Sequence, residues 1–244
     1  MAQQWFFHRG RHVFRQIVAN SHYLATRLSQ HGFPSVSVIW NGVESTPPRP
    51  PLANPPTLAF CGRLIREKGA HILIEAAARL APGIPGLQVI IAGDGPDRTA
   101  LEELALSLRI HHATRFLGHV SRTRLESEFR HAWVQAVPSI CNEAFGLAAA
   151  EAMMRGTAVV ASNLGGLPEI VIPPSNGALV PPASPEALAE ALRPLLSDRP
   201  LAERTGANAR RRALDHFSLE ACTSAFQRLY ATLAPSIRPH LPCP

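Results

Sequence analysis

Short apolar runs alternate with amphipathic segments along most of this chain, and that alternation predicts parallel strands connected by helices. Strands are expected at residues 16–19, 35–40, 57–61, 87–92, 114–117, 132–137, 157–161 and 178–180. Helices are expected at residues 1–15, 22–30, 70–80, 98–108, 122–130, 146–154, 185–197, 201–216 and 219–233. The pattern indicates an α/β fold in which helices cover both faces of a doubly wound parallel sheet.

One segment interrupts this rhythm. Residues 45–56 read STPPRPPLANPP, and so many prolines leave too few N–H donors for regular structure. We place a domain boundary there, between an opening β-α-β block and the longer alternating block. Residues 235–244 are also proline-rich and are expected to be disordered.

Several loops are expected to meet at one edge of the sheet. They follow Cys61, Ala92, Leu117, Val137 and Ala161, each at the end of a predicted strand. Parallel sheets bind ligands at the carboxyl ends of their strands, so these loops are the candidate binding region.

The loop before the helix at 146–154 carries the clearest chemistry. Glu143 precedes Gly146, and Glu151 follows Glu143 by eight positions. A helix N-terminus attracts anions, while carboxylates accept hydrogen bonds from hydroxyls, so the combination fits a nucleotide or a sugar phosphate. The alternative is that Glu143 is a solvated loop acid and Glu151 a surface residue of the helix.

A second loop, GRLIREKG at 62–69, carries two cations. Gly62 leaves room for a close backbone approach, and Arg63 and Lys68 could both reach one diphosphate. Lys68 is the only lysine in the chain, which hints that a compact ammonium is needed there. The alternative is a pair of surface cations.

Three further loops have weaker signals. Asp94 and Asp97 could suggest a metal, but two acids make a poor cage and a turn before a helix is the better interpretation. Gly165, in the loop 163–166, could approach a phosphate or sugar, or serve a plain turn. His119 could line a base pocket, although a lone histidine usually has no such role.

Composition narrows the class of partner. The chain has 244 residues, 46% of them hydrophobic, a net charge of +6 and a pI near 9.9, which fits an anionic partner. Arginines 210–212 form the only basic run and are expected to be a solvated helix face. Because no basic stripe with interleaved aromatic residues is present, nucleic acid is a weak candidate.

Apolar runs and cysteines bear on where in the cell the protein is found. No apolar run is long enough to span a bilayer and the first residues lack the apolar core of a signal peptide, so only peripheral membrane association is expected. The four cysteines have no metal-ligand spacing and suggest reduced thiols in a cytoplasm.

An ordered set of motifs resembles one family. The motifs are GRLIREKG, IAGDGP, FLGHV, PSICNEAFGLAAAEAM, ASNLGGLPEIV and NGALVPPASPEALAEAL, preceded by VANS and IWNGVE. Over residues 16–234 the chain resembles the C-terminal, donor-binding half of the group 1 (family 4) glycosyltransferases of GT-B architecture. The resemblance implies transfer of a sugar from a nucleotide-sugar to an acceptor, with retention of configuration and without metal or any further cofactor.

The resemblance also implies roles for individual residues. Arg63 and Lys68 would hold the donor diphosphate, Glu143 would lie against the donor sugar, and Glu151 would bind the ribose hydroxyls. The remaining donor-site positions that the motifs imply would supply backbone groups or line the base: Gly62, His119, Val120, Phe145, Gly146, Leu147 and Gly165. Ala144 replaces a glycine usual in the family and could crowd the loop.

The resemblance divides the chain into parts. Residues 1–44 would be a remnant of an N-terminal acceptor domain, 45–56 a linker, 57–217 the Rossmann-like donor domain and 218–234 a helix crossing back. An acceptor domain or subunit could act in trans, and apolar surface should remain on residues 1–30 and on the last helix. The alternative function is a non-catalytic subunit that only binds nucleotide-sugar.

Overall fold

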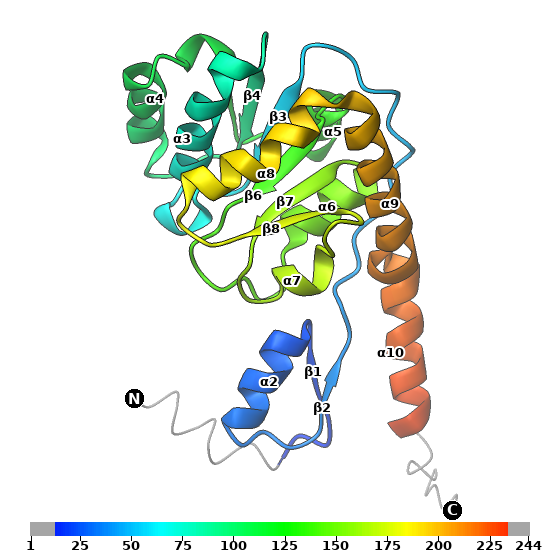
Figure 1. Ribbon diagram of the computed structural model, residues 1–244. Coiled ribbons are helices and arrows are strands. Elements are labelled where there is room, and N and C mark those ends of the chain that lie inside the picture. Colours follow the sequence, from blue (N-terminus) through cyan, green and yellow to red (C-terminus); the bar gives the residue numbers. More distant parts are fainter. Residues whose placement is uncertain (1–12, 234–244) are drawn as a thin grey trace, which may run out of the picture.

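The computed structural model describes residues 13–233 (Figure 1). The strands are β1 (Ile17–Ala19), β2 (Val36–Val38), β3 (Thr57–Cys61), β4 (Gln88–Ala92), β5 (Thr114–Gly118), β6 (Val134–Val137), β7 (Ala158–Ser162) and β8 (Gly177–Val180). The α-helices are α2 (His22–Gln30), α3 (Ala70–Leu80), α4 (Arg98–Ser107), α5 (Arg122–Phe129), α6 (Leu147–Arg155), α7 (Leu167–Ile170), α8 (Pro185–Ser197), α9 (Arg199–Phe217) and α10 (Leu219–Leu233). Short 3-10 turns are η1 (Arg66–Lys68), η2 (Ala81–Gly83) and η3 (His111–Ala113).

Six strands form one parallel sheet in the order β5-β4-β3-β6-β7-β8. Side chains alternate between its two faces, as a pleated strand requires. Leu58 and Phe60 of β3 pack into the core under α3, α4 and α8, whereas Ala59 packs toward α5. On the same face as Ala59, β7 packs against α6 and α9. The predicted parallel sheet with helices on both faces is confirmed.

Most element positions agree with the prediction, and the exceptions are local. Helix α7 was not predicted, because four residues after a glycine pair are too few for a periodic pattern. Val13 and Phe14, at the end of the predicted first helix, are not helical, so the prediction is wrong there. The rest of that helix and the tail at 235–244 lie outside the described residues.

The proline-rich segment is irregular, as predicted, but it is packed against the main domain. Leu52 is almost fully buried and its N–H donates to Glu203. The Arg49 Nε donates to the Gly156 carbonyl at 2.7 Å, and the Trp133 indole donates to the Ala53 carbonyl at 2.9 Å. These contacts order the segment along the outside of the sheet domain.

The N-terminal unit β1-α2-β2 stands apart from the six-stranded sheet and lies in Figure 1 below it, beside α10. Its two strands are parallel, and neither α2 nor α10 has a fully buried residue. Phe14 is 50% exposed and Tyr230 is 62% exposed. The expected apolar surface on this unit and on the last helix is therefore present in the described residues.

The prediction that the arginine run is a solvated face is wrong for Arg210 and Arg212, whereas Arg211 is exposed as predicted. Arg210 donates to the carbonyls of Met154 and Thr46, and Arg212 donates to those of Glu169 and Ile170. Burial lowers the pKa of both guanidinium groups. These arginines satisfy carbonyls at the ends of α6 and α7, a use that helical spacing alone does not reveal.

Within residues 13–233, no helix is both long enough and apolar enough to cross a bilayer.

Candidate functional site

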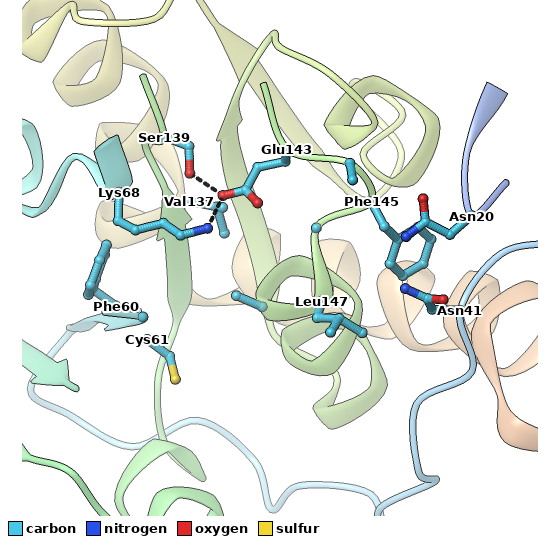
Figure 2. Close-up of a pocket in the computed structure, with 14 residues that line it drawn as sticks. Asn20, Asn41, Phe60, Cys61, Lys68, Val137, Ser139, Glu143, Phe145 and Leu147 are labelled. Carbon is cyan, nitrogen blue, oxygen red and sulfur yellow. Dashed lines mark hydrogen bonds and ion pairs between the residues drawn. The ribbon is translucent and has the colours of Figure 1, made fainter. Parts of the chain in front are cut away.

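A cavity of about 280 Å³ lies at the carboxyl ends of β3 and β6, where the sheet was expected to bind a ligand (Figure 2). Six of the predicted site residues line it: Gly62, Lys68, Glu143, Phe145, Gly146 and Leu147. The lining residues that were not predicted to act are Asn20, Asn41, Phe60, Cys61, Val137, Ser139, Ala144 and Ala148.

An ion pair crosses the cavity. The Lys68 Nζ donates to Glu143 Oε1 at 2.6 Å, and the Ser139 hydroxyl donates to the same oxygen at 2.6 Å (Figure 2). The Lys68 side chain is 26% exposed and that of Glu143 is 16% exposed, so both are partly desolvated and still reachable. In the part of the chain described, Glu143 Oε2 carries no hydrogen bond.

Glycine brings Lys68 to this position. Gly69, just after Lys68, has a φ of +73°, and a Cβ there would lie 1.9 Å from the Pro138 carbonyl oxygen. Only glycine allows the GRLIREKG loop to approach the end of β6 so closely. The position of the single lysine is therefore fixed by the backbone next to it.

The Glu143 loop is supported from behind by the loop 163–166. The Gly166 N–H donates to the Glu143 carbonyl at 2.8 Å. A Cβ on Gly165 would lie 2.2 Å from that carbonyl oxygen, and the φ of Gly165 is +59°. Gly165 does not line the cavity, so the structure places it behind Glu143. Ala144 does not have a positive φ, so the alanine is accommodated without backbone strain.

The N-terminus of α6 opens into the cavity. Gly146 is the cap residue with φ +114°, no side chain caps the helix, and Leu147 and Ala148 both line the cavity. Uncapped amides and the helix dipole favour an anion there. A Cβ on Gly146 would lie 2.6 Å from the Leu167 side chain of α7, so this packing contact requires glycine. The sequence had suggested a different reason for the glycine, which was room for a ligand.

The GDGP loop supports the GRLIREKG loop. Leu64 N donates to the Asp94 carbonyl at 2.9 Å, and Asp97 N donates to the Leu64 carbonyl at 3.1 Å. The Asp94 carboxylate pairs with Arg98. Residues 13–233 contain no group of three or more His, Cys, Asp or Glu residues that could hold a metal ion.

Arg63 lies in the predicted loop but outside the cavity lining. Its side chain is exposed, and no hydrogen bond or ion pair holds it among the described residues. It directly follows Gly62, which does line the cavity, so the structure places Arg63 next to the site in sequence but not in its lining.

Glu151 is half-buried in α6 and does not line the cavity, so the structure does not join it to the Lys68–Glu143 pair. Burial raises the pKa of its carboxyl group. Burial, followed by the nearby charge of Glu151, raises the pKa of the cavity-lining Cys61 thiol to about 11. The helix is fixed beneath them by Arg155, which forms a bidentate ion pair with Glu126 at 2.9 and 3.0 Å. Burial therefore makes the charged form of Glu151 energetically costly, and such perturbed carboxyl groups are often found at functional sites.

His119 and Val120 follow β5, at the same edge of the sheet but outside the cavity lining. The His119 side chain is exposed. Val120 packs partly against the cluster that contains Ala59, Ile90 and Phe129. The structure therefore brings these two residues to the correct edge without joining them to the Lys68–Glu143 pair.

Sequence reasoning missed two asparagines. Asn20 and Asn41 come from the N-terminal unit and lie near Phe145 in Figure 2, at the end of the view away from Lys68. The Asn20 Oδ1 is buried, and among the described residues it has no hydrogen-bond partner. Both residues belong to motifs that the sequence analysis quoted, but no local pattern shows that they meet the loops of the main domain.

The parallel sheet and the cavity at its carboxyl edge define a Rossmann-like α/β domain. A family model described as glycosyl transferases group 1 matches residues 44–212. The chain therefore belongs to this family, and its fold is of the GT-B Rossmann-like type.

Curated relatives agree with this assignment. The chain is 36% identical over 209 residues to a glycogen synthase of Mycobacterium tuberculosis. The aligned region covers 84% of this chain and 50% of that protein. It is 43% identical over 148 residues to a D-inositol 3-phosphate glycosyltransferase of Corynebacterium urealyticum, which covers 58% of this chain and 35% of that protein. The chain thus spans half or less of the length of these relatives.

Solved structures show the same fold. A sucrose-phosphate synthase from Thermosynechococcus elongatus superposes with a TM-score of 0.80 at 31% identity, over 90% of this chain and 58% of that one. Anabaena Alr3699/HepE, solved in complex with UDP-glucose, superposes with a TM-score of 0.77 at 26% identity, over 90% of this chain and 64% of that one.

Proposed function

We propose that this chain is the donor-binding half of a family 4 glycosyltransferase, which transfers a sugar from a nucleotide-sugar to an acceptor with retention of configuration. The observation that carries the proposal is the Lys68–Glu143 pair, which lies in a cavity at the uncapped N-terminus of α6. A cation, a helix dipole and a carboxylate together suit a ligand with both phosphates and hydroxyls.

The diphosphate of the donor would be held by positive groups. Lys68 already lies in the cavity, Arg63 is free to swing toward it, and the α6 amides face the same space. As the bond to the sugar breaks, negative charge develops on the leaving diphosphate. Preorganised cations and amides stabilise such charge effectively in a partly desolvated site, so they would supply the stabilisation that metal ions supply elsewhere.

Glu143 would contact the donor sugar. Its Oε1 is held by Lys68 and Ser139, which fixes the carboxylate and leaves Oε2 to accept a hydrogen bond from a sugar hydroxyl. Glu151 would bind the ribose hydroxyls, and His119 and Val120 would lie beside the base. This arrangement spreads the nucleotide from the loop after β5 toward the centre of the sheet.

The relatives suggest a class of donor, and the cysteines suggest a cellular location. Because the similar HepE was solved with UDP-glucose, uridine diphosphate sugars are the first donors to test. Three free cysteines in residues 13–233 fit a reducing, cytoplasmic setting. The acceptor would be bound largely by an N-terminal domain, to which residues 1–44 would belong.

A second candidate function is binding of nucleotide-sugar without transfer. The favouring observation is that the described residues of the N-terminal unit form a two-stranded sheet and, with Phe14, leave apolar side chains exposed, which suits contact with a separate acceptor-binding domain. Such a chain would bind donor and depend on an acceptor-binding domain or subunit in trans.

Release of nucleoside diphosphate from a panel of nucleotide-sugars separates the two functions. A transferase half is expected to release diphosphate slowly to water or an added acceptor, and Glu143→Gln should reduce that rate by at least about 100-fold. The control is Glu220→Gln, on the first turn of α10, which should leave the rate unchanged. A change at Gln135 would not serve as a control, because the Gln135 side chain donates a hydrogen bond to the Ala148 carbonyl of α6. Tight donor binding without any release would instead support the binding subunit.

A further inference from the structure

The carboxylate of Glu169 joins the two parts of the molecule. It lies in α7, and its two oxygens accept hydrogen bonds from the N–H groups of His22 and Tyr23, each at 2.8 Å. One of the same oxygens also accepts a hydrogen bond from the Trp40 indole at 3.0 Å. All three donors belong to the N-terminal unit, more than a hundred residues away in sequence.

These contacts complete the N-terminus of α2. The first turn of α2 contains no acidic residue, and the Ser21 hydroxyl satisfies only the N–H of Leu24. Glu169 therefore supplies the missing acceptors and the negative charge that the positive end of the helix dipole favours. Hydrogen bonds from backbone amides to a carboxylate are stronger than those between neutral groups.

Glu169 is also connected to the candidate site from the main-domain side. Its N–H donates to the Gly166 carbonyl at 3.1 Å, and the Gly166 N–H donates to the Glu143 carbonyl at 2.8 Å. Arg212 fixes the backbone of α7 by donating to the Glu169 carbonyl at 2.7 Å. The carboxylate thus projects from a segment that directly supports Glu143.

On the other side, Glu169 holds the two chain segments that carry the cavity asparagines. Asn20 lies two residues before His22, and Asn41 directly follows Trp40. The Trp40 ring packs on the Phe217 ring, with 5.4 Å between the ring centroids. Phe217 in turn packs on the cavity-lining Phe145, with 5.7 Å between their centroids. Glu169 is therefore hydrogen-bonded to both segments that carry the cavity asparagines, and the Trp40 packing adds a second contact on the Asn41 side.

The asparagines are placed to meet the sugar end of a donor. The proposed base loop follows β5, at one edge of the sheet, whereas Phe145 and its neighbours lie beyond β6 on the side of β7. The buried Asn20 Oδ1, which has no partner among the described residues, would be satisfied by a sugar hydroxyl.

We propose that Glu169 is a positioning residue that holds Asn20 and Asn41 against the sugar of a bound nucleotide-sugar. The inference rests on the proposed function and deepens it, because it assigns one side chain to the junction between the N-terminal unit and the donor loops. Loss of the carboxylate should loosen contacts to the sugar and leave contacts to the nucleoside diphosphate intact.

The test compares two ligands on the full chain. The ligands are the best-binding nucleotide-sugar from UDP-glucose, ADP-glucose and GDP-mannose, and its free nucleoside diphosphate. In Glu169→Gln an amide N–H₂ faces groups that can only donate, so we expect about 10-fold weaker binding of the nucleotide-sugar by calorimetry. The Kd of the free diphosphate should stay within about 2-fold, a split that general destabilisation would not produce.

Two further variants make the result specific. Glu203→Gln is the matched control, because Glu203 also accepts a backbone N–H, that of Leu52 at 3.0 Å, but the segment that it holds contributes no residue to the cavity lining. It should change neither Kd. Asn20→Ala combined with Glu169→Gln should weaken nucleotide-sugar binding little more than Glu169→Gln alone, because both changes remove the same contact.

Hydrogen exchange gives a readout that needs no ligand. The amides of His22 and Tyr23 should exchange at least about 10-fold faster in Glu169→Gln, while those of β3 and β6 stay protected. Unchanged exchange at these two amides, or equal weakening of both ligands, would overturn the positioning role while the proposed function stands. If the wild-type chain binds neither ligand, the proposed function fails and this role fails with it.

Discussion

Lys68 and Glu143 form the chemical centre of the site, and their geometry explains why each residue type is present. The ammonium donates at 2.6 Å to a carboxylate oxygen that the Ser139 hydroxyl also contacts. An arginine at position 68 would bring a wider, planar group with five donors into a cavity of about 280 Å³. Under the proposed function, the compact ammonium of Lys68 leaves room for a phosphate beside it.

Glu151 gives a prediction about pH at the scale of one residue. Because burial raises the pKa of the Glu151 carboxyl in the folded chain above its ordinary value in an unfolded chain, its contribution to stability is full below that ordinary value. This contribution is lost as the pH rises through the folded-state pKa, since the buried group then becomes charged.

Glu151→Gln removes this titration. We expect the variant and the wild type to have similar free energies of unfolding at pH 4, and the variant to become relatively more stable as the pH rises toward 8. Chemical denaturation at several pH values measures the difference. A difference that does not change with pH would show that Glu151 is not desolvated as described.

At the scale of elements, the site depends on loops that support one another. The loop 163–166 holds the Glu143 loop, and the GDGP loop holds the GRLIREKG loop, in both cases through backbone hydrogen bonds. Glycine is needed where these backbones meet, because a Cβ would overlap a carbonyl oxygen. The site geometry is therefore a property of the paired loops more than of any one side chain.

Gly165→Ala tests this support directly. The substitution combines a positive φ with a Cβ only 2.2 Å from the Glu143 carbonyl oxygen, so we expect the free energy of unfolding to fall by about 3 kcal/mol. Donor affinity should fall as well, because Glu143 is displaced. Thermal or chemical denaturation measures the first effect and calorimetry the second.

Gly62→Ala is the matched control. Its new Cβ would meet only the Phe60 ring at 3.5 Å, which is ordinary contact, and its backbone does not have a positive φ. It should change the free energy of unfolding by less than about 1 kcal/mol. Equal destabilisation by the two alanines would contradict the proposed support of Glu143.

The elements themselves were largely predictable from sequence. Strand β3 and helices α3 and α10 have the bounds that apolar periodicity predicts, and the loops after the strands do meet at one edge. These features depend on local patterns of period 2 and 3.6, which the sequence displays. The loop residues Lys68 and Glu143 were also predicted, because parallel topology brings such loops together.

The rest depends on contacts between distant segments. Asn20 and Asn41 reach the cavity through contacts between the N-terminal unit and the main domain, among them the hydrogen bonds to Glu169 and the packing of Trp40 on Phe217, and nothing local to the two asparagines indicates this. Arg210 and Arg212 were mistaken for a solvated run because helical spacing does not show which carbonyls lie opposite. Such pairings follow from the tertiary fold and not from propensity.

At the scale of the whole molecule, the chain is a Rossmann-like domain with a small second unit attached. The N-terminal unit contributes two residues to the cavity and is joined to the main domain by Glu169, while the proline-rich segment runs along the main domain. Apolar side chains such as Phe14 and Tyr230 are exposed on this unit and on α10, and the proposed function expects the acceptor-binding domain to pack there. Under the proposed function, donor binding uses residues that this chain contains.

The central claim is that the Lys68–Glu143 cavity binds a nucleotide-sugar, and calorimetric titration of the full chain with UDP-, ADP- and GDP-sugars tests it most directly. We expect one donor to bind and Lys68→Met to weaken it by about 100-fold, since a charge-assisted phosphate contact is lost. Arg79→Met, which removes an exposed cation of α3 that does not line the cavity, should leave the affinity unchanged. A folded chain that binds no donor, or binds one equally well without Lys68, would contradict the account.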